Sequence, residues 1–149
     1  MLINQPKETL SFKISLNGTF WDKLPEYSIW LNDEFISSGT ANEELQFIEF
    51  THSIAEGTQN KLIIKLLNKE DGDTVESEDK SNIIKDMLLN IDSISIDDIE
   101  LGQLMWSLSK FIADDPNRPT LKNCVNLGWN GSYVLEFTSP FYLWLLENM

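Results

Sequence analysis

The chain has 149 residues, of which 42% are hydrophobic and 11% aromatic, so it has enough apolar material for a core and does not resemble a disordered chain. Its 24 acidic residues outnumber its 11 basic ones, and a net charge of −13 excludes the basic face that nucleic-acid binding requires. The charge also disfavours anionic membranes, and no apolar run approaches the roughly 18 residues of a membrane span. We therefore expect a neutral, cationic or protein partner, with no nucleic acid and no membrane insertion.

The N-terminal residues and the cysteine content bear on the compartment. Cys124 is the single cysteine, so no disulfide can form within the chain. The first residues lack a basic segment followed by an apolar one, so we expect no secretory signal. Both observations favour synthesis in a cytoplasm, and they allow later incorporation into an assembled particle.

The first half of the chain alternates between apolar and polar residues, the pattern of half-buried strands. Asn17-Gly18 is a dipeptide typical of tight turns and predicts a turn after the first strand. Residues 61–67 are apolar on both faces, which predicts a central strand. The expected strands of this half cover residues 10–16, 27–31, 45–50 and 61–67, with a loop at 54–58.

The second half begins with a predicted acidic loop at about 70–82, which holds six carboxylates and no basic residue over 70–79. A change of parity near Asp92-Ser93 predicts a bulge within a strand that runs from Met87 to Ile96 and is extended by Ile99 and Leu101. Asn130-Gly131 predicts a hairpin between alternating segments on either side. Leu104, Trp106 and Leu108 predict a further strand, 113–120 a loop, and 141–146 either a last strand or a short helical turn that closes the core.

These segments amount to about eight to ten short strands with regularly spaced turns and no long helix, the pattern of a sandwich or barrel. We find neither an internal repeat nor a linker. The expected fold is an all-β antiparallel β-sandwich, of jelly-roll type, in a single domain over residues 1–149.

The inventory of reactive residues argues against an enzyme. His52 is the only histidine and Cys124 the only cysteine, which excludes a zinc site built from several His and Cys ligands. We interpret His52 as a surface or strand-end residue and Cys124 as a buried structural thiol. No glycine-rich phosphate loop is present. Carboxylate pairs for glycoside hydrolysis arise by chance in so acidic a chain, so we expect no catalytic residues.

Calcium is the one cofactor that the residues suggest, because it takes carboxylate and carbonyl oxygens from loops. Neither of two acidic clusters has the spacing of an EF-hand, and the alternative for residues 70–79 is a solvated loop that keeps the protein soluble. The first cluster comprises Asp71, Asp73, Glu76, Glu78 and Asp79, and the second Asp92, Asp97, Asp98 and Glu100.

Aromatic residues suggest a ligand-binding surface. Trp21, Tyr27 and Trp30 lie close together in the sequence, and Trp30 has the opposite parity to its neighbours, so it faces outward. Exposed rings of this kind stack on sugars, and the alternative is a second packing layer or a protein interface. The C-terminal Phe141, Tyr142 and Trp144 are better explained as core or interface anchors.

Residues 60–69, 73–75 and 85–97 together resemble the central strands of calcium-dependent xylan-binding modules, in which a strand ending in Asn leads through an acidic loop to further strands. The resemblance implies that Asn68, Asp73 and Asp86 lie nearest a calcium site. The aromatic and Asp pattern of the sugar-contacting loop in those modules has no counterpart here, so the resemblance does not assign sugar-contacting residues.

Residues 15–23 and 126–146 together resemble small proteins of tailed bacteriophages, especially those of marine cyanobacteria. This resemblance implies a virion component. Our main hypothesis from sequence is therefore a non-enzymatic structural module of a phage virion (decoration, neck, tail or fibre-associated) that binds other virion proteins or itself. The alternative is a calcium-dependent carbohydrate-binding module that recognises polysaccharide on a host surface.

Overall fold

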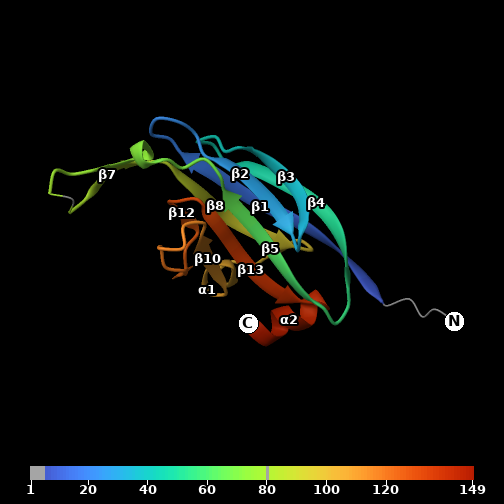
Figure 1. The fold of residues 1–149 in the computed structure, drawn as a ribbon. Helices are drawn as coiled ribbons and strands as arrows, with labels where there is room; N and C mark the ends of the chain where they lie inside the picture. The colour runs from blue at the N-terminus through green and yellow to red at the C-terminus, as the bar shows by residue number, and fades with distance from the viewer. Residues whose placement is uncertain (1–5, 80) are drawn as a thin grey trace.

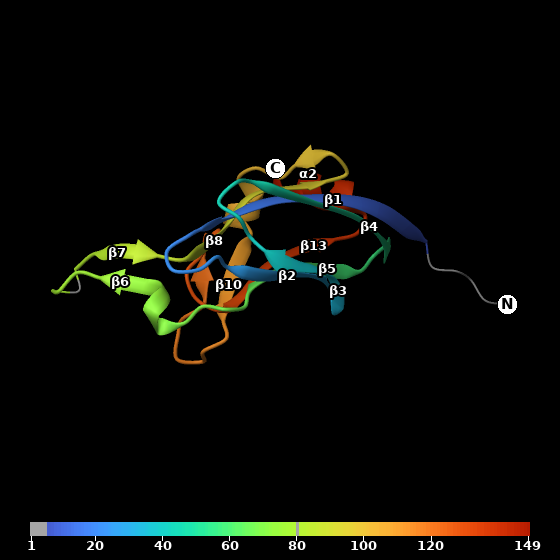
Figure 2. The ribbon, with the colours of Figure 1, turned by 90° about the horizontal axis from the view of Figure 1, so that it is seen from above.

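A computed structural model describes residues 6–79 and 81–149, which form two packed antiparallel sheets and a two-stranded arm (Figure 1). The all-β sandwich predicted from sequence is confirmed. Residues 1–5 of the expected domain, and Lys80 of the expected acidic loop, lie outside the described residues. Seen from above, β1 and β4 lie over β2, β5 and β3, so the two sheets form two layers (Figure 2).

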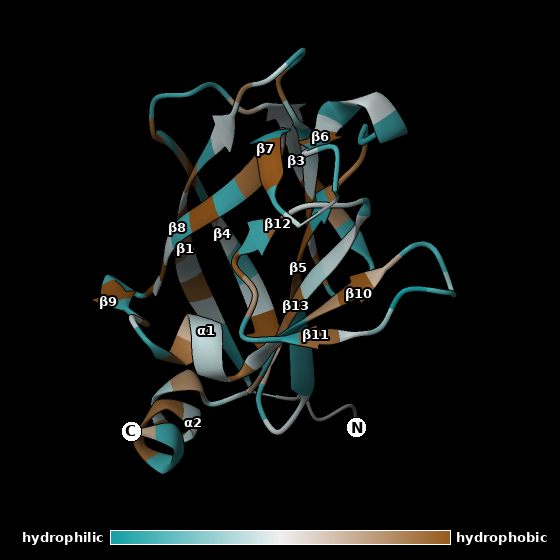
Figure 3. Ribbon diagram, turned by 90° about the vertical axis from the view of Figure 1, so that its left-hand side faces the viewer, coloured by the Kyte–Doolittle hydropathy of each residue, from teal (hydrophilic) through white to brown (hydrophobic). Residues whose placement is uncertain are grey.

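The first sheet is built around β1 (Lys7–Thr19), which pairs with β4 (Gln46–Ala55) on one side and β8 (Leu88–Ile96) on the other. The short strands β12 (Asn126–Leu127) and β9 (Ile99–Glu100) both pair with β8. Apolar and polar residues alternate along β8 (Figure 3). One face of this sheet is therefore directed into the sandwich.

The second sheet has the order β11-β10-β13-β5-β2-β3. Its strand β5 lies between β13 and β2, which confirms the prediction of a central strand for residues 61–67. The strand β3 was not anticipated from sequence, because its residues include Ser and Gly and are mostly exposed or half-buried. The strands are β2 (Glu26–Leu31), β3 (Glu34–Thr40), β5 (Gln59–Leu66), β10 (Ser109–Ala113), β11 (Leu121–Lys122) and β13 (Gly131–Thr138).

Much of the predicted acidic loop forms an arm. The 3-10 turn η1 (Asp71–Asp73) leads into β6 (Thr74–Glu76), which pairs with β7 (Ile83–Asp86) in a separate two-stranded sheet. The arm projects from one end of the sandwich (Figures 1 and 2). The polar residues that predicted a loop are thus compatible with a short, exposed hairpin.

The core lies between the two sheets and is closed by the C-terminal helix. Phe12 stacks on Phe50 at 4.8 Å between ring centroids and contacts Phe137 of the other sheet at 6.2 Å. The helix α2 (Phe141–Asn148) places Phe141 and Trp144 against Phe137, with ring centroids 6.4 and 6.2 Å from that of Phe137. The tail is thus the helical alternative that the sequence left open, and it closes the core as expected.

The register confirms the predicted bulge. Ser15 lies opposite Ser93 and Leu16 lies opposite Ile91, so Asp92 is the extra residue on β8. The bulge explains the change of parity, because an extra residue restores the inward direction of Ile94 and Ile96 after Ile91.

Both Asn-Gly predictions were wrong. Asn17 and Gly18 lie within β1 and pair with Asn90 and Leu89, and the Gly18 amide donates to the carbonyl oxygen of Asn42. A Cβ on Gly18 would lie 2.7 Å from both the Ala41 carbonyl oxygen and the Pro25 ring. Glycine is therefore required there for a close approach of two segments and not for a turn.

Asn130-Gly131 does not close a hairpin, because the two segments that it separates belong to different sheets. β12 pairs with β8 in the first sheet, whereas β13 pairs with β10 and β5 in the second. The dipeptide therefore crosses from one layer to the other.

The predicted strand through Leu104, Trp106 and Leu108 was also wrong. Residues Leu104–Ser107 form the one-turn helix α1, and Leu108 and Trp106 are exposed. The Tyr133 hydroxyl donates to the Met105 carbonyl oxygen at 2.5 Å and holds the turn on the second sheet. A single helical turn is too short to produce a helical period in the sequence.

Two strand boundaries also differ from expectation. The third predicted strand, β4, extends to Ala55 and β5 begins at Gln59, so the predicted loop at 54–58 is reduced to a tight turn. Gly57 supplies the left-handed conformation of that turn, with φ of +80°.

Candidate functional site: a polar cleft beside the arm

A cleft of about 920 Å³ lies where the arm joins the sandwich. The arm and the segment before it form one side, and the loop after β10 and the segment before β13 form the other. Its size falls within the range of about 300–1,000 Å³ that small-ligand pockets occupy. The lining residues are Lys69, Glu70, Asp71, Thr74, Glu76, Ile83, Asp86, Asp114, Asp115, Arg118, Gly128, Trp129 and Asn130.

The lining of the cleft is strongly acidic. Six carboxylates face two basic side chains, Lys69 and Arg118, and further hydrogen-bonding groups come from Thr74 and Asn130. A carboxylate accepts hydrogen bonds but repels anions. The cleft is therefore suited to a ligand that presents hydroxyl or amine donors and carries no negative charge.

Trp129 gives the cleft an aromatic wall. Its ring stacks on Phe111, with centroids 6.0 Å apart, and the Arg118 guanidinium lies over it at 4.3 Å. Within the described part of the chain, no group accepts a hydrogen bond from the buried indole Nε1 of Trp129. Arg118 comes from the exposed loop after β10, whereas Phe111 belongs to the buried core. One face of the ring is thus fixed by the core and the other is covered by a side chain on an exposed loop.

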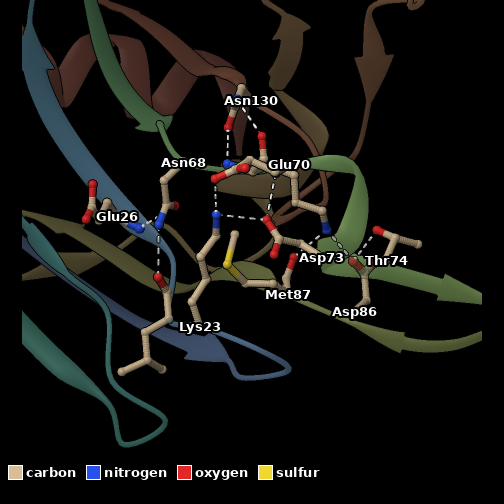
Figure 4. A network of polar contacts seen from close by, with 11 residues as sticks. Lys23, Glu26, Asn68, Glu70, Asp73, Thr74, Asp86, Met87 and Asn130 are labelled. Carbon is tan, nitrogen blue, oxygen red and sulfur yellow. Dashed lines mark hydrogen bonds and ion pairs between the residues drawn. The ribbon is translucent and has the colours of Figure 1, made fainter.

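Asn130 joins the two sides of the cleft. Its side-chain oxygen accepts a hydrogen bond from the Lys69 amide at 2.7 Å, and its Nδ2 donates to the Lys69 carbonyl oxygen at 3.1 Å (Figure 4). Both bonds are to backbone, as in the pairing of two strands. The base of the cleft is therefore held in one position before any ligand arrives.

Asn68, the first residue that sequence assigned to a calcium site, has a structural role. Its Oδ1 accepts a hydrogen bond from the Glu26 amide at 2.8 Å and its Nδ2 donates to the Leu24 carbonyl oxygen at 3.1 Å. Both polar atoms of the side chain are thus used to hold the segment that leads into β2.

Asp73, the second assigned residue, is buried and paired with a lysine. Lys23 Nζ lies 3.1 Å from Asp73 Oδ2 and 2.7 Å from Glu70 Oε1 (Figure 4). Burial alone would raise the pKa of Asp73, but hydrogen bonds from Asp22, the Glu70 amide and Lys23 together lower it. The same hydrogen bond to Asp73 is the main cause of a raised pKa at Asp22. Asp73 is therefore the carboxyl of this pair that is held ionised.

Asp86, the third assigned residue, contacts Lys69. The Lys69 ammonium donates to Asp86 Oδ1 and, at 2.6 Å, to the Met87 carbonyl oxygen, and Thr74 Oγ1 donates to the same Asp86 oxygen at 2.7 Å. In residues 6–79 and 81–149, no three His, Cys, Asp or Glu side chains are grouped so that they could hold a metal ion. The assigned residues therefore do not fit a calcium ion as they are arranged here.

Three of the other predicted acidic ligands, Asp79, Asp97 and Asp98, lie in turns. Asp97 and Asp98 have φ of 51° and 63° in the turn between β8 and β9, and Asp97 Oδ1 accepts a hydrogen bond from the Ser11 amide at 2.8 Å. At the tip of the arm, hydrogen bonds from Ser77 and Ser81 lower the pKa of Asp79 to about 2. Short polar side chains such as Asp stabilise tight turns, which accounts for these acidic residues without a metal ion.

The three aromatic residues predicted to bind ligand do not share one exposed face. Tyr27 is only 5% exposed because its side chain points into the core, and this burial raises its pKa. Trp30 is half-buried on the other face of β2, and its ring centroid lies 5.4 Å from that of Phe35. Trp21 lies in a loop, where Lys85 Nζ is 4.0 Å from the centroid of its ring. Ligand binding by Trp21 or Trp30 individually stays a prediction.

His52 and Cys124 have local partners. His52 lies within β4, and its hydrogen bond to Glu34, 2.6 Å from Nε2 to Oε2, raises its pKa. Cys124 is half-buried, its thiol donates to the Asn126 carbonyl oxygen at 3.3 Å, and burial raises the thiol pKa.

Sequence reasoning missed the cleft and its residues Trp129, Arg118, Asp114 and Asp115. Trp129 was assigned to a hairpin strand, and the loop at 113–120 was interpreted only as a connection. A weak signal was present, because the single arginine of the chain and two adjacent aspartates share that loop. Nothing in the sequence places this loop opposite the arm.

Comparisons with known proteins identify the fold. Neither a protein-family model nor a curated protein sequence matches the chain. Two solved structures are similar at a TM-score of 0.53 and 12% identity. One is vCBM60 in complex with galactobiose, matched over 84% of this chain and 96% of that one, and the other is the selenomethionine form of vCBM60, matched over 85% and 89%. The second is described as evidence that circular permutation links two families of calcium-dependent carbohydrate-binding modules.

At this identity the similarity shows the fold alone, a sandwich similar to that of vCBM60, which is a carbohydrate-binding module. Such modules are in general non-catalytic. No comparison connects the chain to a bacteriophage, so the virion role, virion partners and virion localisation remain predictions from sequence. Among the described residues, none of the helices combines the length and apolar character needed to cross a membrane.

Proposed function

We propose that the chain is a carbohydrate-binding module that holds a neutral glycan in the cleft beside the arm. The observation that carries this proposal is the cleft itself: it is polar and pre-organised, and it has a tryptophan in its wall on a sandwich similar to vCBM60. The proposal selects the carbohydrate-binding alternative over the virion-structural hypothesis, for which no feature of the cleft gives support.

The charge of the cleft determines the class of glycan. Hydroxyl groups of a neutral sugar donate to the carboxylates of Asp114, Asp115 and Glu76, all of which are exposed, while Arg118 donates to sugar oxygens. Uronic acids would add negative charge to a lining that already has an excess of carboxylates. Neutral polysaccharides are therefore bound and acidic ones are rejected.

Trp129 supplies the apolar contact. A sugar ring that displaces the Arg118 guanidinium lies on the ring face opposite Phe111, and the released guanidinium remains within reach of the sugar hydroxyls. Stacking on tryptophan and hydrogen bonding to the loop then act together. Calcium is not given a role in this contact, because the assigned ligands Asp73 and Asp86 are already paired with lysines.

The test is affinity gel electrophoresis and calorimetry against neutral polysaccharides and short neutral oligosaccharides, with a uronic-acid polymer in parallel. Trp129→Leu keeps apolar contact with Phe111 and removes the indole, and we expect it to weaken binding at least about tenfold, or about 1.4 kcal/mol. Trp30→Leu makes the same substitution on the outer face of the second sheet and leaves binding unchanged.

Three results contradict the proposal. One is the absence of binding to any neutral glycan. Another is stronger binding to the uronic-acid polymer than to neutral ones. The third is loss of binding in Trp30→Leu with retention in Trp129→Leu, which would move the site to the outer face of the second sheet.

A further inference from the structure

The ammonium of Lys69 lies where oxygen ligands converge at the base of the arm. The Lys69 side chain is only 8% exposed, and that of Asp86 is 17% exposed. Asp86 Oδ1 and the Met87 carbonyl oxygen both accept hydrogen bonds from the ammonium, and Thr74 Oγ1 also donates to Asp86 Oδ1. A carboxylate and a carbonyl oxygen on one buried cation are ligand types that calcium also takes.

A second lysine repeats this arrangement on the other side of η1. Lys23 contacts Glu70 and Asp73, and the Asp73 side chain is only 2% exposed. Asp73 and Asp86 are joined through the backbone, because the Met87 amide donates to the Asp73 carbonyl oxygen at 2.9 Å. The buried carboxylate of Asp73 and the partly buried carboxylate of Asp86 are therefore each paired with a lysine of the same chain.

We propose that Lys69 and Lys23 take the place of a divalent cation, so that the arm is fixed to the sandwich, and the cleft is shaped, without calcium. A calcium ion needs six to eight oxygen ligands at about 2.3–2.6 Å, and it would have to displace a buried ammonium from two of them. This contrasts with the calcium dependence described for the similar modules. Metal-independent folding of the arm stands on these contacts alone, whereas metal-independent glycan binding also rests on the function proposed above.

The direct test measures thermal unfolding of the unaltered protein in a chelator, in millimolar calcium and in magnesium at matched ionic strength. The expected result is the same Tm in all three solutions. A rise in Tm that is specific to calcium would overturn the proposal, because any ligand that binds only the folded state stabilises it.

Variants test whether the lysine is the cation that matters. Lys69→Met removes the charge and keeps the apolar stem, and Lys110→Met is the matched control at an exposed position on β10. In chelator, we expect Lys69→Met to lower Tm by several degrees more than Lys110→Met. The double variant Lys69→Met/Asp86→Asn should be more stable than the sum of its two single changes predicts, because it leaves no buried charge unpaired. An equal effect of the two lysine substitutions, or strict additivity in the double variant, would overturn the role of Lys69.

Glycan binding measured in chelator separates this inference from the proposed function. Binding in chelator supports both. If no glycan binds in any solution while Tm is insensitive to calcium, the proposed function fails and the lysine substitution stands. If both Tm and glycan binding require calcium, the substitution fails and the proposed function stands.

Discussion

Replacing Gly131 with alanine tests the close packing of β10 against β13 beside the cleft. Gly131 is the first residue of β13 and pairs with Ala113 of β10 and Leu66 of β5. A Cβ at this position would lie 2.5 Å from the Ile112 carbonyl oxygen, 2.9 Å from the Ala113 Cα and 3.0 Å from the Phe111 ring. The two shortest contacts are to backbone, so a flexible side chain cannot relieve them by rotating. The strands would have to move apart.

Overpacking of this kind costs about 1–3 kcal/mol of unfolding free energy. With a denaturant dependence of about 2 kcal/mol per M urea, a loss of about 2 kcal/mol moves the midpoint down by about 1 M. Two other glycines separate the steric cause from backbone strain. Gly57 has φ of +80° and Gly72 does not have a positive φ, and a Cβ at either would have nothing within 4 Å. Gly57→Ala should cost about 1–2 kcal/mol through strain alone, and Gly72→Ala should be neutral or stabilise by up to about 1 kcal/mol.

Urea unfolding followed by circular dichroism measures all three variants under the same conditions. The expected order of stability is Gly72→Ala, then Gly57→Ala, then Gly131→Ala. If Gly131→Ala unfolds at the same urea concentration as Gly72→Ala, the close approach of β10 and β13 is refuted.

Three further predictions concern the supports of the sandwich. Asn68→Ala removes both hydrogen bonds that hold the segment before β2 and should cost about 1–3 kcal/mol in urea unfolding; no loss would show that solvent replaces them. Trp144→Ala should cost about 3–5 kcal/mol of unfolding free energy because it removes a buried ring from the core. Tyr142 is 61% exposed on the same helix, so Tyr142→Ala should change stability by no more than about 0.5 kcal/mol. Equal losses in the two variants would contradict this orientation of the helix. The pKa of His52 is raised in the folded state by Glu34, so its contribution of up to about 1 kcal/mol is fully present below the unfolded pKa near 6.5 and is lost as pH rises through the folded value. His52→Gln should therefore lose stability relative to the unaltered protein at pH 6 but not at pH 9, and parallel pH profiles would rule this out.

The sequence predicts the sandwich well because strand alternation is a local consequence of burial. The inward-facing side chains of β1 and β5 are apolar over residues 10–16 and 62–66, and the pattern persists whichever strand lies alongside. The bulge at Asp92 was predictable for the same reason, since an extra residue must shift the parity of all later residues in the strand. Pairing partners were not predictable in this way, because alternation is the same for a neighbouring strand and for a distant one.

The Asn-Gly errors show a physical ambiguity of glycine. Glycine is favoured where φ is positive, but also wherever two backbones approach too closely for a Cβ. Gly18 and Gly131 belong to the second kind, and neither has a positive φ. The contacts that demand them come from segments distant in sequence, Ala41 for Gly18 and Ile112 for Gly131, so no local pattern separates the two cases.

The candidate site was predicted only in part, and for a similar reason. Asp73 and Asp86 lie together at the base of the arm, where the Met87 amide donates to the Asp73 carbonyl oxygen. Their partners Lys23 and Lys69 reach them from 50 and from 17 positions earlier in the chain. Considered alone, the residues of an acidic segment predict a cation site. In the folded chain, lysines from other segments form ion pairs with these carboxylates instead.

The low identity to the similar modules follows from the division between core and loops. Inward positions of a sandwich require apolar side chains of suitable volume and not particular residues, so a TM-score of 0.53 is compatible with 12% identity. The cleft is built differently: Asp114, Asp115 and Arg118 belong to one exposed loop, which can change without loss of the core. Similarity of the sandwich therefore indicates the scaffold, and the proposed ligand depends on a loop that the similarity does not constrain. For this chain, the acidic lining of the cleft is the better guide to the ligand than the galactobiose bound by vCBM60.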